Sequence, residues 1–295
     1  MLDVILQVLI NGVFLGGVYA LIAIGLTLIF GVVRVINFAQ GDFVMLGMYA
    51  SYWLFVLFGM DPYVSFLITT PCFIAVGVLM HKFIINPIIN APPLAQMFST
   101  FGLSIVLTNG ALLLWKSDYR AIQTSYANSV LLIGNLVINV PRLVVFVVTL
   151  SLVIGLYIFL TRTFFGKALT AIAQDREAAM LMGVDIQKAY CAALGLGTGL
   201  AGLAGGLLMP LYTVYPAIGL HFSIGAFVVV VLGGMGNMFG AFLGGMVIGL
   251  VESLSGFFIS PQLQMAMHYL IFVIFLVIRP QGMLGMAGAQ EMGLK

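Results

Sequence analysis

Charge is the property that this sequence has least of. Of its 295 residues, 11 are Lys or Arg and 9 are Asp or Glu, so 7% are charged, whereas 62% are hydrophobic. Soluble domains have roughly a quarter of their residues charged. The mean hydropathy of +1.20 points the same way. A chain with so few charges cannot cover itself with a water-facing surface, and the composition therefore predicts an integral membrane protein.

Cysteine is also scarce, and no basic patch is present. Cys72 and Cys191 lie in or beside apolar segments and have no His or Asp companions. We therefore expect packing residues, with no disulfide and no metal site. A net charge of +2 without clustered basic residues gives no reason to expect nucleic acid as a partner.

Motifs of catalysis and of nucleotide binding are missing. No phosphate-binding loop of the GxxxxGK(S/T) type occurs, so the chain is not expected to hydrolyse ATP, and we expect no cofactor. The stretch HFSIG, 221–225, contains a serine, but His221 stands where the first glycine of a nucleophile turn belongs. No catalytic residue is predicted.

Long apolar stretches are what the sequence has instead. A membrane helix needs about 20 predominantly apolar residues. We count eight or nine such stretches, depending on whether Gly233–Gly245 is a turn between two short helices or a break within one long helix. The prediction is an all-α, polytopic membrane helix bundle that forms one domain, 1–295. The expected spans are 5–32, 43–59, 64–86, 96–115, 143–161, 189–213, 218–236, 239–258 and 264–280.

Lysine and arginine in the short loops predict the orientation, because cytoplasmic loops carry more of them. Nine alternating spans place more basic residues on one side, which we expect to be cytoplasmic. The amino terminus would then lie outside and the carboxyl terminus inside. Residues 162–188 form the largest cytoplasmic loop and 116–142 the largest external loop. The basic residues are Arg34, Lys82, Arg162, Lys167, Arg176, Lys188 and Arg279 on the first side, and Lys116, Arg120 and Arg142 on the second.

Small residues recur four positions apart, for example in the pairs Gly12/Gly16 and Gly245/Gly249. Such pairs let the backbones of membrane helices approach closely. We therefore expect a tightly packed bundle of helices.

The loop 162–188 is rich in charge and yet has the pattern of a helix. Asp175 is placed as an N-cap, good helix formers follow over Arg176–Met182, and Gly183 stands where a left-handed C-cap is expected. Glu177 lies in the first turn, where the helix dipole favours negative charge. The sequence predicts a short helix at the cytoplasmic surface.

Two interpretations of this helix stay open on the residues alone. It can rest on lipid headgroups, as amphipathic loops often do. Alternatively, it docks into a groove on a partner through a small, adaptable apolar surface. The residues of that surface would be Ala178, Ala179, Met180 and Met182. Upstream, Phe165, Ala168, Leu169 and Ile172 fall at helical spacing and form one apolar face.

Four stretches of the sequence are similar to known motifs. FGKALTAIAQDREAAMLMGVD contains Glu-Ala-Ala followed, after three residues, by Gly183, and is similar to the EAA loop that docks ABC importer permeases onto their ATPases. The others are GLTLIFGVVRVINFAQGDFVMLGMY (25–49), VVVVLGGMGNMFGAFLGG (228–245) and RPQGMLG (279–285). Together, and in this order along essentially the whole chain, they resemble the LivH-type permease subunits of branched-chain amino acid ABC transporters.

This resemblance implies the fold and partners of an ABC importer permease in the bacterial inner membrane. The chain would translocate branched-chain or other hydrophobic amino acids, together with a second homologous permease, two ATPase subunits and an external substrate-binding protein. Urea, short amides and other small organic solutes are alternative substrates. The ATPase-coupling residues that the resemblance implies are Gly166, Leu169, Asp175, Arg176, Glu177, Ala178, Ala179, Met182 and Gly183.

Polar residues within or beside the spans are candidates for a translocation path. Asn37, Gln40 and Asp42 can equally form a turn that satisfies a helix end, and Ser104 and Thr108 can equally bond between helices. In the family that the chain resembles, histidine often replaces Gln40; glutamine cannot gain charge near neutral pH. The candidate path residues are Asn11, Asn37, Gln40, Asp42, Thr100, Ser104, Thr108 and Glu252.

Glu252 and His268 are ionisable residues inside predicted spans, and such residues usually face an interior or a cavity. A structural pairing competes with a role on the path. The rival from another class is an ion-coupled secondary transporter, which needs a coupling site near the midplane of the membrane. These two residues are the only suitable candidates, and a capped cytoplasmic helix has no role in that design.

Overall fold

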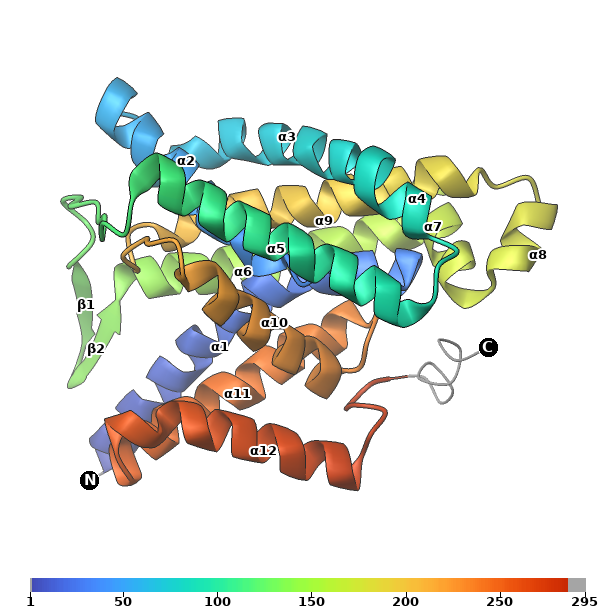
Figure 1. Ribbon diagram of the computed structural model, residues 1–295. Coiled ribbons are helices and arrows are strands. Elements are labelled where there is room, and N and C mark those ends of the chain that lie inside the picture. The colour runs from blue at the N-terminus through green and yellow to red at the C-terminus, as the bar shows by residue number, and fades with distance from the viewer. Residues whose placement is uncertain (1, 286–295) are drawn as a thin grey trace.

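The computed structural model describes residues 2–285, and within them the chain is a bundle of helices (Figure 1). Eight helical spans are long and apolar enough to cross a membrane, and α10 is apolar but has 16 residues. Each predicted span overlaps one of these helices, which confirms the helical bundle. They are α1 (Leu2–Val33), α2 (Gln40–Phe58), α3 (Pro62–Met80), α5 (Pro93–Trp115), α6 (Val140–Arg162), α9 (Ile186–Leu208), α10 (Ile218–Gly233), α11 (Met238–Phe258) and α12 (Gln264–Ile278).

Shorter elements extend or join these helices. A π-helical turn, His81–Ile85, continues α3 into α4 (Asn86–Ile88), and a 3-10 turn, Pro261–Leu263, leads into α12. Two helices, α7 (Phe164–Gln174) and α8 (Arg176–Leu181), lie between α6 and α9. Two strands, β1 (Val130–Ile133) and β2 (Leu136–Asn139), lie between α5 and α6.

A turn separates α10 from α11, which decides between the two alternatives for Gly233–Gly245. Gly234 and Gly236 have φ angles of +104° and +83°, a backbone region that side chains disfavour. Asn237 then caps α11, because its Oδ1 accepts a hydrogen bond of 2.9 Å from the backbone N–H of Gly240. The two apolar stretches are therefore separate helices, the first of them short.

The bundle has two ends that differ in character (Figure 1). α7 and α8 protrude at one end, which we name the charged-loop end (residues 163–185). The β1–β2 hairpin protrudes at the other, which we name the hairpin end (residues 116–139). The helices run between the two ends, so the short loops gather in two layers.

The core of the bundle is built from α1, α9 and the first part of α2. Most of α1 and α9 is buried, whereas α5, α6 and α12 expose most of their side chains. α1 crosses α11 at the glycine pairs Gly12/Gly16 and Gly245/Gly249. A methyl group on Gly16 would lie 2.7 Å from the Cα of Met246, so only glycine permits this approach. The predicted close packing is confirmed at this crossing.

α2 begins inside the bundle. The segment 34–39 turns back from the end of α1, and Gln40 and Asp42, in the first turn of α2, are fully buried. The Gln40 side chain inserts between two glycines: its Nε2 donates to the carbonyl oxygen of Gly197 on α9 at 3.1 Å and lies against Gly25 on α1. The polar turn predicted here thus lies within the protein interior.

The β hairpin was not predicted, since only a loop was expected over 116–142. β1 and β2 pair antiparallel through a turn at Gly134 and Asn135, with Gly134 at a φ angle of +62°. Gln7 of α1 bonds Val137 of β2 through both its side-chain groups, each at 2.8 Å. The loop is therefore ordered by the pairing of two strands that are adjacent in sequence and joined by a Gly-Asn turn.

The segment 279–285 packs against the turn between α10 and α11. Met283 donates its N–H to the carbonyl of Leu232 at 2.8 Å, and Leu284 donates to that of Gly233 at 3.0 Å. Two of the stretches that carry the family resemblance, 228–245 and 279–285, therefore form a single structural unit at the charged-loop end.

Candidate functional site

The predicted caps of the 176–182 helix are both present in α8. Asp175 Oδ1 accepts hydrogen bonds from the backbone N–H groups of Glu177, at 2.9 Å, and Ala178, at 3.0 Å. Gly183 has a φ angle of +82°. Its N–H donates to Met180, and that of Val184 donates to Ala179, which is the Schellman pattern of bonds. The start and the stop of the helix are confirmed.

The exposed surface of α8 differs from the predicted one. Leu181 is 89% exposed and Met182 is 85% exposed, whereas Ala179 is 4% exposed and faces the bundle. Ala179 therefore does not lie on the free surface, because the turn of the helix points it inward. Leu181 was not among the predicted residues of that surface. Ala178, Met180 and Met182 are exposed as predicted, and Arg176 and Glu177 are exposed as well.

α7 anchors α8 to the bundle. Leu169 and Ile172 on its inner face are buried, so the predicted apolar face faces the protein. A side chain at Gly166 would overlap the carbonyl oxygen of Phe159, so glycine lets α7 fold directly onto α6. Arg34, at the end of α1, donates to the carbonyl oxygen of Ala173 at 3.0 Å. α8 is therefore connected, through α7, to helices that cross the bundle.

The capping groups around α8 also fix the start of α9. Asp185 accepts a hydrogen bond of 3.1 Å from the backbone N–H of Lys188 and forms an ion pair with its ammonium at 3.0 Å. Both interactions hold the pKa of the Asp185 carboxyl below its ordinary value, and the backbone hydrogen bond has the larger effect. The guanidinium of Arg176 lies 5.7 Å from the ring centre of Tyr190 on α9. α8 is thus held by the Asp175 cap at its start and by the contact of Arg176 with Tyr190 of α9.

A second site is a buried carboxylate at the start of α2. Asp42 is fully buried and accepts hydrogen bonds from two hydroxyl groups of α5, those of Ser104 and, at 2.9 Å, Thr108. It makes no ion pair within residues 2–285. A side chain on Gly219, in the first turn of α10, would overlap the Asp42 carboxylate. Asp42 therefore joins three helices, and a buried carboxylate without a cation is a site where positive charge is stabilised.

Further predicted polar residues surround this carboxylate. Thr100 donates to the carbonyl of Ile36 at 2.9 Å, and the amide of Asn37 donates to Gln40 at 3.3 Å. Ser223 donates to the carbonyl of Phe38 at 2.7 Å and accepts from the N–H of Gly41 at 2.9 Å. Ser223, the serine of the HFSIG stretch, was not among the candidate path residues, but it is buried in this group, since α10 starts within the bundle. We name Asn37, Gln40, Asp42, Thr100, Ser104, Thr108 and Ser223 the polar cluster.

Two candidate path residues lie apart from the polar cluster. Asn11 is half-buried near the hairpin end, where it accepts a 3.3 Å bond from Gln7. Fourteen residues of helix, or about 20 Å, separate it from Gly25 beside Gln40. Glu252 accepts a 2.7 Å hydrogen bond from Tyr19, and its Oε2 lies 3.6 Å from Nδ1 of His268. Glu252 and His268 are therefore paired with each other, as the structural alternative predicted.

No group of three or more His, Cys, Asp or Glu that could hold a metal ion occurs in the part of the chain that the structure describes. Cys72 is exposed and Cys191 half-buried, and both are free thiols. The arrangement therefore offers an exposed, capped helix at one end and a polar cluster inside the bundle.

Comparison with known proteins agrees with this architecture. The family described as "Branched-chain amino acid transport system / permease component" matches residues 8–276. The high-affinity branched-chain amino acid transport system permease protein BraD of Pseudomonas aeruginosa is 31% identical over 95% of this chain and 95% of its own length. LivH of Salmonella typhimurium and LivH of Escherichia coli are 32% and 31% identical, each with the same coverage.

Among solved structures, PsaBC from Streptococcus pneumoniae in complex with Fab aligns over 92% of this chain and 91% of the matched chain, at 14% identity and a TM-score of 0.49. The sequence relatives and the family match share the whole membrane-spanning part of the chain. The chain therefore belongs to the family of permease components of branched-chain amino acid transport systems.

Proposed function

We propose that the chain is the membrane-spanning subunit of an ABC importer that moves branched-chain amino acids into a bacterial cell. Two ATPase subunits hydrolyse the ATP, a second homologous permease completes the channel, and an external binding protein delivers the substrate. Short amides, urea and other small organic solutes are the second candidate substrates. The family membership, and the transport of branched-chain amino acids named for the relatives, support this proposal.

The observation that carries the proposal is the exposed apolar end of α8. Leu181 and Met182 protrude from a helix whose two ends are capped and whose neighbour, α7, is packed onto the bundle. Exposed apolar side chains on a rigid, water-facing helix are typical of a helix that docks into a groove. In this proposal the groove belongs to an ATPase, and the movement of α8 tips the bundle between its two open states.

The substrate path in this proposal passes the polar cluster. Asp42 supplies a negative charge for the ammonium group of an amino acid, and the hydroxyls of Ser104 and Thr108 supply uncharged hydrogen bonds. These groups pass a zwitterion without binding it tightly, because affinity lies in the external binding protein. Asn11 and Glu252 are also proposed along the path, nearer the hairpin end.

The charged-loop end lies in the cytoplasm in this proposal, and the amino terminus lies outside. The positive-inside rule supports it, since most basic residues flank the charged-loop end. In a variant with both natural cysteines replaced by serine, Asn135→Cys should react with an impermeant maleimide in intact cells. Gln187→Cys, at an exposed position beside α8 but outside the proposed ATPase contact, should react only after the cells are opened. The reverse pattern would overturn the orientation.

The docking proposal is tested with one exposed leucine at each end of the molecule. Leu181→Asp puts a charge on the proposed ATPase contact, and Leu132→Asp puts the same charge on the hairpin, where Leu132 is 71% exposed. We expect the first variant to lose the co-purifying ATPases and ATP-driven uptake, while the second keeps both. If Leu181→Asp retains normal amounts of ATPase, α8 is not the docking helix.

The ion-coupled alternative makes a different prediction. A secondary transporter stops working when an uncoupler collapses the proton gradient and continues when ATP is depleted. The ABC importer continues with the uncoupler and stops without ATP. Uptake into vesicles that carry the whole complex, with ATP supplied on one side, separates the two.

A further inference from the structure

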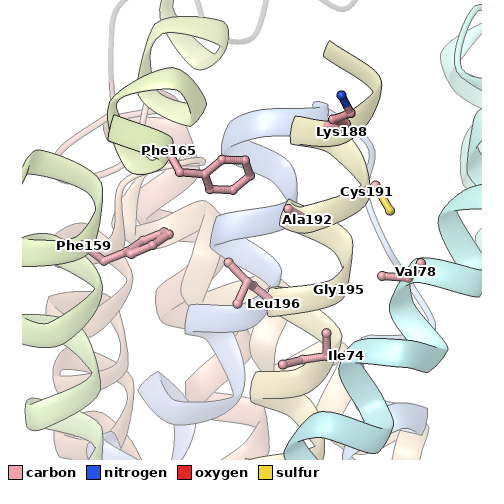
Figure 2. Close-up of a pocket in the computed structure, with 9 residues that line it drawn as sticks. All are labelled: Ile74, Val78, Phe159, Phe165, Lys188, Cys191, Ala192, Gly195 and Leu196. Carbon is pink, nitrogen blue, oxygen red and sulfur yellow. The ribbon is translucent and has the colours of Figure 1, made fainter. Parts of the chain in front are cut away.

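An apolar slot opens on the side of the bundle near the charged-loop end (Figure 2). Its volume is about 480 Å³, within the roughly 300–1,000 Å³ range of ligand pockets. α9 forms the floor, α3 one wall, and the junction of α6 and α7 the other wall. The lining residues are Ile74, Val78, Phe159, Phe165, Lys188, Cys191, Ala192, Gly195 and Leu196.

The slot exists because its floor is made of small residues. Cys191, Ala192 and Gly195 fall on one face of α9, between the aromatic wall and the Ile74–Val78 wall (Figure 2). Leu196 lies eight residues beyond Lys188, so the slot reaches about 12 Å along the helix axis. That direction leads from the charged-loop end into the part of the bundle that crosses the membrane.

Basic residues lie near the mouth of the slot. Lys188 lies at the outer end of the floor (Figure 2). Two exposed basic residues follow wall residues at about one helical turn: Lys82 four positions after Val78, and Arg162 three positions after Phe159. Asp185 pairs with Lys188, and within residues 2–285 Lys82 and Arg162 have no carboxylate partner.

These two features together define the occupant. An almost wholly apolar slot between membrane-spanning helices is not a site for water, and an empty slot would leave its walls without dispersion contacts. Lipid acyl chains are the apolar molecules that surround such helices, and basic residues at a membrane surface attract anionic headgroups. We propose that this slot binds an acyl chain of an anionic phospholipid, whose phosphate lies near Lys82, Arg162 and Lys188.

Such a lipid would lie against both sides of the α6–α7 junction, because Phe159 and Phe165 belong to the same wall. The site is independent of the substrate path, since no residue of the polar cluster lines it. It depends on membrane insertion, which the family and the apolar helices show, and it does not depend on the identity of the transported solute.

The test measures lipid that the intact complex retains. The complex is purified in mild detergent from native membranes, and bound phospholipids are counted and identified by native mass spectrometry. We expect one more anionic phospholipid on the wild type than on Ala192→Trp, which fills the slot. Lys188→Gln combined with Arg162→Gln, changes of exposed side chains, should lower the retained anionic lipid about tenfold, as the loss of a strong ionic contact does.

Cys191 gives a second readout that does not depend on the slot-filling variant. In Cys72→Ser complexes reconstituted in phosphatidylcholine vesicles, addition of phosphatidylglycerol should slow maleimide labelling of Cys191. In the Lys188→Gln/Arg162→Gln background the rate should not change. Cys72, exposed and outside the slot, is the control in Cys191→Ser complexes. Equal lipid retention by all variants, retention of zwitterionic lipid only, or a Cys191 shielded by another subunit whatever the lipid would each overturn the proposal.

Discussion

The hydroxyl of Tyr19 on α1 donates a 2.7 Å hydrogen bond to Oε2 of Glu252 on α11. His268 of α12 faces the same oxygen at 3.6 Å, and its ring packs edge-on against that of Tyr19. His268 is the buried residue of α12, whose other side chains are largely exposed. The Glu252 carboxylate therefore ties a peripheral helix to the centre of the bundle.

Substitutions of Glu252 distinguish its role in holding α12 to the bundle from a role on the substrate path. Glu252→Gln keeps an acceptor for Tyr19, whereas Glu252→Ala leaves Tyr19 and His268 without a partner, which costs about 1–3 kcal/mol per unsatisfied group. We expect the thermal midpoint of the purified complex to fall more for Ala than for Gln. Uptake with competing amino acids is the second measurement. A changed substrate preference in Glu252→Gln at a normal thermal midpoint would place the residue on the path.

Substitutions at Gly183 test whether α8 couples ATP hydrolysis to uptake. Its φ of +82° is strained for valine, so Gly183→Val should disturb the end of α8 and reduce coupling of ATP hydrolysis to uptake. Gly183→Asn, which tolerates this conformation, should behave nearly as the wild type. Gly59→Val is the matched control for Gly183→Val. Gly59 ends α2 with a φ of +65° and, like Gly183, has open space around it. Normal coupling in Gly183→Val, measured as ATP hydrolysed per substrate imported, would contradict the docking assignment.

Local patterns in the sequence predicted the helices and the caps of α8. Asp175 and Gly183 act through backbone groups a few residues away, so their roles follow from sequence order alone. The spans were predicted equally well, because the length and hydropathy of a membrane helix are set by the bilayer. Only the ends of the helices differ from the prediction. For example, the span expected over 189–213 ends at Leu208.

Long-range relationships could not be predicted in this way. Nothing local to Gln40 indicates that Gly25 and Gly197, far apart in sequence, leave room for its side chain between α1 and α9. The sequence also placed Ala179 in the docking surface of α8, because a helix this short does not reveal which side meets the bundle. Asn37, Gln40 and Asp42 were predicted as one turn and Ser104 and Thr108 as bonds between helices, but their assembly around Asp42, with Ser223, required the fold.

The bonds from α5 to Asp42 test the proposed path. Thr108→Val removes the hydroxyl with little change of shape, and Thr108→Ser keeps it. Hydrogen bonds to charged groups contribute about 1.5–3 kcal/mol, so we expect uptake per complex to fall about tenfold or more in Thr108→Val and to stay near normal in Thr108→Ser. Asp42→Asn should lower uptake further. If only the amount of assembled complex falls and uptake per complex is unchanged, the cluster serves folding alone.

The approach of α10 to Asp42 gives a prediction about a single methyl group. Gly219 lies so close to the Asp42 carboxylate that the Cβ of Gly219→Ala would overlap it, and backbone has to shift because the carboxylate is held by Ser104 and Thr108. Gly155→Ala on α6 is the matched control, since nothing lies within 4 Å of its Cβ position. Alanine there favours the helix by roughly 0.5–1 kcal/mol. We expect the thermal midpoint of the purified complex to fall for Gly219→Ala and to stay the same or rise for Gly155→Ala. Equal midpoints would mean that α10 starts further from Asp42 than the structure places it, and the carboxylate would then be open to the interior of the bundle.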